Sequence, residues 1–296
     1  MVSYNTHDWL KNLFQLKKAD TFRKLFPIIL IVCGYTALVA YIEVNYLKLP
    51  ESSPLKQFTM FHTLLGFVIS MLLVFRTNTA YDRWWEGRKQ WGTLVNNSRN
   101  FAIKLNSFLP QDATSDRVFF TKVIPLFALA LQRHLHAETT RLELDSEPHP
   151  ELPTLDHTRH LPNQVASAMA MKLQKLYKQQ VISGEQLLFV NAELQSFLEV
   201  CGACERIKNT PIPFSYSSFI KKFIFLYIIT LPIGLSFSMH FIVVPVVGLA
   251  FYVLGSLELI AEEIEDPFGK DENDLPMEKM AANIRKNVED IMHCGQ

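Results

Sequence analysis

The sequence predicts an all-α membrane protein with four transmembrane helices per subunit and a helical cytosolic region. The prediction depends on three long stretches without charged residues, on basic residues beside their ends, and on a central block with helical periodicity. The 296 residues contain 29 Lys and Arg against 29 Asp and Glu. A chain without net charge offers no basic surface of the kind that binds nucleic acid, so no nucleic-acid partner is expected.

The first two spans are predicted near the N-terminus. Leu25 to Ile42 has no charged residue and approaches the roughly 20 residues that cross about 30 Å of hydrocarbon. Residues 48–54 contain two prolines and predict a short turn, because proline lacks a donor and restricts its predecessor. Gln57 to Phe75 is again free of Asp, Glu, Lys and Arg, and it predicts the second span.

The third apolar stretch runs from Phe223 to Leu257, which is too long for one span. As a single helix it would extend about 50 Å at about 1.5 Å per residue. A break between Ser236 and Pro245 would divide it into a third and a fourth span joined by a tight hairpin.

Basic residues beside the spans predict which side of the membrane faces the cytoplasm. They are Lys17, Lys18, Arg23, Lys24, Arg76, Arg83, Arg88, Lys89, Lys221 and Lys222. With no signal peptide in the polar N-terminal segment, we expect a multi-pass protein of the cell inner membrane with both termini in the cytoplasm. The expected divisions are a cytosolic amphipathic N-terminus (1–24), transmembrane helices 1 and 2 (25–76), a helical cytosolic domain (77–220), transmembrane helices 3 and 4 (221–257) and an acidic cytosolic tail (258–296).

The central block is predicted to be helical. Asp116 could cap a helix that ends at Leu135, and Ser183 with Gln186 has the spacing of a capping box that opens another helix. Three prolines within residues 137–161 predict a loop. Apolar residues of the block recur at steps of three, four and seven: Trp84, Trp91, Val95, Ala102, Leu105 and Leu109.

The second span carries the first indication of function. Phe67, Met71 and Phe75 stand four residues apart and therefore share one helical face. The default role of such a stripe is contact with lipid or with other helices. The alternative is a narrow apolar pore neck, formed when several subunits place this face around one axis.

Three further segments decide between these roles. They are FRTNTAYDRWWE at residues 75–86, TPIPFSY at 210–216 and IEDPFGKDENDL at 264–275. Together with the apolar stripe, and in this order, they resemble the bestrophin family of ion channels. The resemblance implies a homopentamer around a central pore, with four membrane helices per subunit and a large helical cytosolic part.

The resemblance also implies roles for individual residues. Phe67, Met71 and Phe75 match the three-ring neck of the family, with Met where other members carry Ile or Phe. Glu185 falls on the lower cytosolic aperture, which is often apolar, and the alternative is a solvated glutamate in the first turn of a helix.

The acidic segment after the last span resembles a calcium-binding loop of the family, the calcium clasp. Asp271 and Asp274 match the two acids of this clasp, and oxygen ligands suit calcium. An acidic loop that is merely solvated is the alternative. No cofactor is therefore required, and calcium is possible.

The expected function is a passive ion channel for small monovalent ions, chiefly chloride and other anions. A sodium channel favoured by an acidic Glu185 ring is one alternative, and a membrane-anchored scaffold is another. The chain contains no Gly-rich phosphate loop, nucleophile elbow or His-Glu-x-x-His pattern, so no enzyme is expected. The expected partners are other copies of the chain, the lipid bilayer and small inorganic ions.

Overall fold

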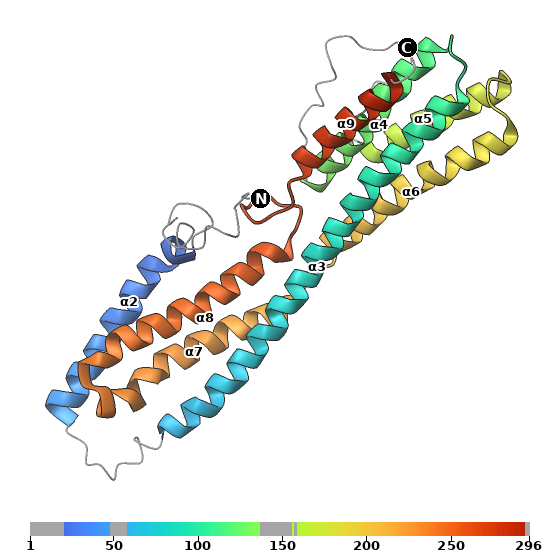
Figure 1. Ribbon diagram of the computed structural model, residues 1–296. Helices are drawn as coiled ribbons and strands as arrows, with labels where there is room; N and C mark the ends of the chain where they lie inside the picture. The colour runs from blue at the N-terminus through green and yellow to red at the C-terminus, as the bar shows by residue number, and fades with distance from the viewer. Residues whose placement is uncertain (1–20, 48–57, 137–155, 157–158, 294–296) are drawn as a thin grey trace. The chain divides into compact units, whose positions relative to one another are not determined.

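The computed structural model describes residues 21–47, 58–136, 156 and 159–293, and these residues form helices and no strand (Figure 1). The N-terminal 20 residues, the predicted turn at 48–54 and most of the predicted loop at 137–161 lie outside the described part. The elements are α2 (Thr21–Ile42), the π-helix η1 (Glu43–Leu47), α3 (Phe58–Phe108), α4 (Thr114–Leu135), α5 (Leu161–Lys178), α6 (Gly184–Asn209), α7 (Phe214–Met239), the 3-10 helix η3 (His240–Ile242), α8 (Val243–Glu265) and α9 (Met277–His293).

The chain divides into two compact units, and α3 contributes to both. Unit 1 comprises residues 1–83, 211–266 and 271–273, while unit 2 comprises residues 84–210, 267–270 and 274–296. Unit 1 therefore contains α2, the first half of α3, α7 and α8. Unit 2 contains the second half of α3 together with α4, α5, α6 and α9.

Unit 1 is a bundle in which α2 packs along α8 and α7. A Cβ on Gly248 of α8 would lie 2.8 Å from the Cys33 sulfur of α2, so a larger residue at position 248 would require the Cys33 side chain to shift. The start of α2 is held by a hydrogen bond of 2.9 Å that the Thr21 hydroxyl donates to the Ser256 hydroxyl. On the first half of α3, His62 lies in hydrogen-bonding contact, 3.0 Å, with Thr230 of α7.

The third apolar stretch forms two helices, as predicted. α7 ends at Met239 and α8 begins at Val243, so the break lies inside the predicted interval. His240 makes the turn with a positive φ of 50°. Pro245 lies in the first turn of α8, where its missing N–H would have no partner within the helix in any case.

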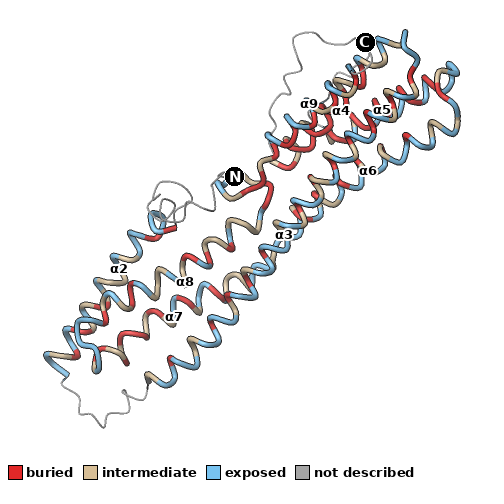
Figure 2. Tube along the Cα trace, viewed as in Figure 1, coloured by how far each residue is buried: buried red, intermediate tan, exposed pale blue. Residues whose placement is uncertain are grey.

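The helices of unit 1 bury few of their apolar residues inside the protein (Figure 2). Only 11% of the most apolar stretch of α2 is buried. In the segment Phe214–Glu265, which contains α7 and α8, 17% of the most apolar stretch is buried. Ile31, Phe225 and Leu249 are each more than 60% exposed. Water would not tolerate so much exposed apolar surface, whereas a lipid bilayer would.

Unit 2 buries its apolar residues in a core of its own. α4 is long and apolar enough to cross a membrane, but 67% of its most apolar stretch is buried. Aromatic rings fill the centre, with Phe197 of α6 lying 5.6 Å from Phe101 and 5.1 Å from Phe127 between ring centroids. The hydropathy of α4 thus reflects a protein core.

The helix starts of unit 2 confirm one predicted cap and correct the other. The Gln186 amide donates to the Ser183 hydroxyl at 3.2 Å, and the Ser183 amide donates to the Gln186 side chain at 2.8 Å, which is the predicted capping box. The cap predicted at Asp116 is wrong, because α4 begins at Thr114 with no side-chain cap. The Asp116 carboxylate lies inside the first turn and pairs with Lys172 at 2.6 Å.

We expect Phe197→Ala to lower the free energy of unfolding of unit 2 by about 3–5 kcal/mol, because a fully buried ring leaves a cavity. Thermal unfolding of the detergent-purified protein, followed by near-ultraviolet circular dichroism, measures the change. The neighbouring Leu198 is 42% exposed, so Leu198→Ala is a matched control with a much smaller effect. Equal losses of stability in the two variants would contradict this description of the core.

Candidate functional site

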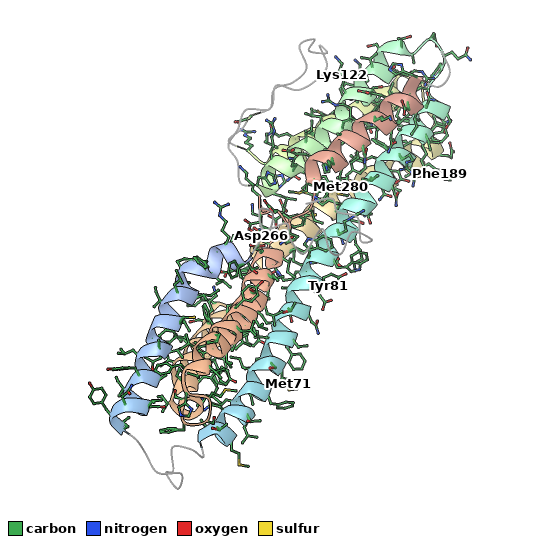
Figure 3. The ribbon with its side chains drawn as sticks, turned by 60° about the vertical axis from the view of Figure 1, so that its left-hand side comes forward. Met71, Tyr81, Lys122, Phe189, Asp266 and Met280 are labelled. Carbon is green, nitrogen blue, oxygen red and sulfur yellow. The ribbon has the colours of Figure 1, made fainter. Side chains whose placement is uncertain are left out.

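The three residues predicted to form a neck lie on one exposed face of α3. Phe67, Met71 and Phe75 are 71%, 50% and 54% exposed, and Figure 3 marks Met71 on this stretch of the helix. Successive steps of four residues place them along the same side of an α-helix. The structure therefore presents all three side chains together on the surface of the single chain.

A buried stripe on the same helix fixes which side of α3 faces outward. Ile69, Leu73, Arg76 and Ala80 are each no more than 1% exposed. At 3.6 residues per turn these residues lie roughly opposite the predicted neck residues. Packing inside unit 1 thus turns the Phe67, Met71 and Phe75 face away from the unit.

The exposed face becomes polar beyond Phe75. Asn78 and Asp82, which follow Phe75 by three and seven residues, are both exposed. Our sequence analysis did not single out either residue. The sequence did contain a pattern that could have found them, because Asn78 and Asp82 continue the helical spacing of Phe67, Met71 and Phe75. A face that changes from apolar to amide and carboxylate suits a surface that leads from an apolar constriction into water.

Four glutamates of α8 form a second feature of unit 1, which we call the acid row: Glu258, Glu262, Glu263 and Glu265. The sequence suggested that these residues begin an acidic tail, but the structure places them in the last turns of α8. Each has a basic partner. The Lys24 ammonium lies 2.5 Å from Glu263, and the Lys221 ammonium lies 2.8 Å from Glu262.

Arg76 provides the buried part of this network. Its guanidinium is 1% exposed and lies 2.7 Å from the Glu265 carboxylate and 3.7 Å from the Glu258 carboxylate. Glu258 is itself only 5% exposed. Burying these charges costs several kcal/mol per ion, so the arrangement persists only while the opposite charges remain in contact.

Glu265 joins three segments of unit 1. Its carboxylate accepts hydrogen bonds from Arg76 of α3 and from the Ile212 amide just before α7, both at 2.7 Å. Its backbone carbonyl accepts a hydrogen bond of 3.0 Å from Arg83. One residue at the end of α8 therefore holds the middle of α3 and the start of α7 beside it.

Glu185 is exposed in the first turn of α6. The Ser183 hydroxyl donates to its carboxylate at 2.7 Å, and this hydrogen bond lowers the pKa of the Glu185 carboxyl. The side chain is consequently ionised at neutral pH. The next turn exposes Leu188 and Phe189, which are 73% and 63% exposed. A ring of such surfaces would present both a carboxylate and apolar groups.

The structure places the two predicted calcium ligands in different environments. Asp271 is exposed and belongs to unit 1, whereas Asp274 is 2% exposed and belongs to unit 2. Within unit 2, the Leu275 amide donates to the Pro267 carbonyl at 3.0 Å. Carboxylate and carbonyl oxygens are the donor types that fit calcium. The calcium clasp stays a prediction.

Comparison with known proteins identifies the family. Residues 1–290 match the family model described as bacterial and fungal bestrophin protein. The chain belongs to the bestrophin family. The all-α membrane fold expected from the sequence is accordingly confirmed.

Curated relatives and solved structures resemble most of the chain. A voltage-dependent anion channel-forming protein of Nostoc sp. is 33% identical over 290 residues, which cover 96% of this chain and 91% of the relative. A protein of the same description from Synechocystis sp. is 35% identical over 77% of this chain and 75% of its own length. The crystal structure of a bacterial bestrophin homologue from Klebsiella pneumoniae has a TM-score of 0.77 at 26% identity, covering 89% of this chain and 97% of the other.

We expect Arg76→Met in this bestrophin to destabilise unit 1 by about 3–5 kcal/mol, because the buried Glu258 and the partly buried Glu265 would lose the cation that contacts both carboxylates. Thermal unfolding in mild detergent measures the change. Lys221→Met is the matched control, since it removes an exposed pair that contributes about 0–1 kcal/mol. A loss from Arg76→Met no larger than that from Lys221→Met would show that the buried network is dispensable.

Proposed function

We propose that this bestrophin is a passive channel for chloride and other small anions. The observation that carries the proposal is the exposed face of α3, on which Phe67, Met71 and Phe75 are followed by Asn78 and Asp82. The names of the relatives from Nostoc and Synechocystis, voltage-dependent anion channel-forming proteins, support anions as the conducted species. An apolar constriction can open and close to ions by gaining and losing its water.

We propose that α2, the first half of α3, α7 and α8 cross the inner membrane. Their apolar residues are mostly unburied, which supports contact with lipid. Lys24, Arg76, Arg83 and Lys221 lie at or near one end of these helices, and that end is assigned to the cytoplasm. Unit 2 and both termini are then cytoplasmic. The buried apolar residues of α4 support this placement of unit 2.

We propose that the pore is enclosed by several copies of the chain. One exposed helix face cannot surround a passage, whereas a closed cyclic oligomer can. The family resemblance favours five subunits, so that Phe67, Met71 and Phe75 each form a ring. Chemical cross-linking in mild detergent tests the assembly. A discrete ladder of cross-linked species that ends at five subunits supports the pentamer. A protein that stays monomeric would favour a membrane-anchored scaffold.

Glu185 supports the second candidate, a channel for sodium and other monovalent cations. Its carboxylate is ionised and exposed, so a ring of copies would raise the local cation concentration. Solvent screening at an exposed site weakens this field beyond about 8 Å at physiological ionic strength. Anion conduction therefore remains the first proposal, and the reversal potential distinguishes the two.

We propose that calcium can bind the clasp but is not required for conduction. Oxygens of Asp271, Asp274 and the loop between them would supply the coordination. Conductance measured in the presence of excess chelator and then across a calcium titration tests this assignment. A conductance that does not respond to calcium, together with no bound calcium in equilibrium dialysis, would identify a merely solvated acidic loop.

We expect Phe67→Ala, Met71→Ala and Phe75→Ala combined in one protein to raise single-channel conductance, because smaller side chains widen and wet the neck. Planar bilayer recording measures the change. Phe225→Ala removes a ring that is 66% exposed on α7, so it serves as a control with unchanged conductance. Unaltered conductance in the triple variant would remove these residues from the pore.

We expect the parent protein to reverse near the chloride equilibrium potential under a salt gradient, and Glu185→Gln to shift this potential only slightly. The reason is the high dielectric around an exposed carboxylate. Bilayer recordings at low and high salt give the comparison. A parent that reverses near the cation potential, and a Glu185→Gln protein that loses this preference, would establish the sodium alternative.

A further inference from the structure

Two histidines and one glutamate of unit 2 converge from three helices. His134 lies in the last turn of α4, His160 immediately precedes α5, and Glu205 lies in α6. The two imidazole rings are 4.2 Å apart between centroids. Our sequence analysis did not connect these residues, because they are distant in the chain and belong to no spaced motif.

Their polar atoms point at a common centre. The Nε2 atoms of His134 and His160 lie 2.6 Å and 2.5 Å from the same carboxylate oxygen, Oε1 of Glu205. One atom from each residue can be chosen such that all three lie within 4.8 Å of one another. The three side chains are 30% or 31% exposed, so an ion from solvent can reach them.

We propose that His134, His160 and Glu205 form a binding site for a first-row transition metal ion of the zinc class. Two imidazole nitrogens and one carboxylate oxygen are a ligand set that zinc accepts, with the fourth position filled by water. Two nitrogen ligands disfavour calcium and magnesium, which prefer oxygen. Among the described residues, no other group of three or more His, Cys, Asp or Glu side chains has this arrangement.

Geometry limits the ligand set to these three residues. Cys201, which lies four residues before Glu205 in α6, is not counted among the ligands, because its sulfur lies outside the set of ligand atoms that are within 4.8 Å of one another.

Metal binding must change the local geometry in two ways. Ligand atoms about 2.0–2.2 Å from a tetrahedral ion are separated by about 3.3 Å, so each imidazole must withdraw by less than 1 Å from Glu205. His160 also caps α5, since its Nδ1 accepts the Asn163 amide at 3.2 Å. A neutral ring that binds metal through Nε2 carries its proton on Nδ1, so this capping hydrogen bond is exchanged for the metal bond.

The site would connect the end of α4, the start of α5 and the last turns of α6. A ligand that binds only the folded protein stabilises it by mass action. We therefore expect zinc to protect unit 2 against thermal unfolding, whatever it does to conduction.

The test is a titration of the detergent-purified, tag-free, chelator-treated protein with Zn²⁺ alone, measured by isothermal titration calorimetry against a competing chromophoric chelator. The parent should bind one zinc per chain. The double variant His134→Gln/His160→Asn should bind zinc at least about 10–100-fold more weakly. A loss of that size already follows when a residue that only hydrogen-bonds a metal ligand is removed. Asn is chosen at residue 160 because it preserves the cap.

Three further proteins complete the experiment. His293→Gln changes an exposed histidine of α9 and should bind zinc as the parent does. Glu205→Gln keeps a hydrogen-bond acceptor but removes the charge, so it should bind more weakly if it elutes as the parent does on size exclusion. Cys201→Ser should leave binding unchanged. Zinc should raise the melting temperature of the parent and not that of the double variant.

Either of two results would overturn the site: no zinc bound by the parent at micromolar concentration, or equal affinity in the parent and in a folded double variant. The histidines and Glu205 would then form a hydrogen-bonded tie between helices and no metal site. The assay measures binding and stability without conduction. Its failure would leave the proposed channel intact, and failure of conduction would leave the metal site intact.

Discussion

The buried charges around Arg76 are the constraint on which the rest of unit 1 depends. The guanidinium occupies the helix side opposite the exposed face of α3, and its contacts with Glu258 and Glu265 fix the rotation of the helix. Because Glu265 also accepts the Ile212 amide, the start of α7 is held at the same place. The outward direction of Phe67, Met71 and Phe75 is therefore a consequence of a polar network as much as of apolar packing.

The two units use similar helices for different purposes. α2 and α4 both satisfy the length and hydropathy of a membrane span, yet 11% of the one and 67% of the other is buried in protein. The two buried fractions differ because different helices pack against α2 and α4. α4 is covered by the helices of its own unit, among them α9, which contributes the buried residues Met280, Ile284 and Val288 at steps of four. Hydropathy alone cannot distinguish a lipid-facing helix from the centre of a soluble bundle.

Much of this protein could be predicted from local patterns. The break after Met239 followed from a stretch too long for one span, and the Ser183 cap followed from its spacing to Gln186. Asp116 was misassigned, because a long-range contact with Lys172 competes with capping. The pairing of the acid row, and the meeting of His134, His160 and Glu205, depend on tertiary contacts for which the sequence holds no periodic signal.

The glutamates of the acid row face cations at short range. Their four carboxylates pair with Lys24, Arg76 and Lys221, all within unit 1, and Arg83 donates to the Glu265 backbone carbonyl. Opposite charges a few ångströms apart leave little field at distances beyond the Debye length of about 8 Å. An ion farther away than this therefore meets little net attraction or repulsion from the paired groups, although they carry many charges.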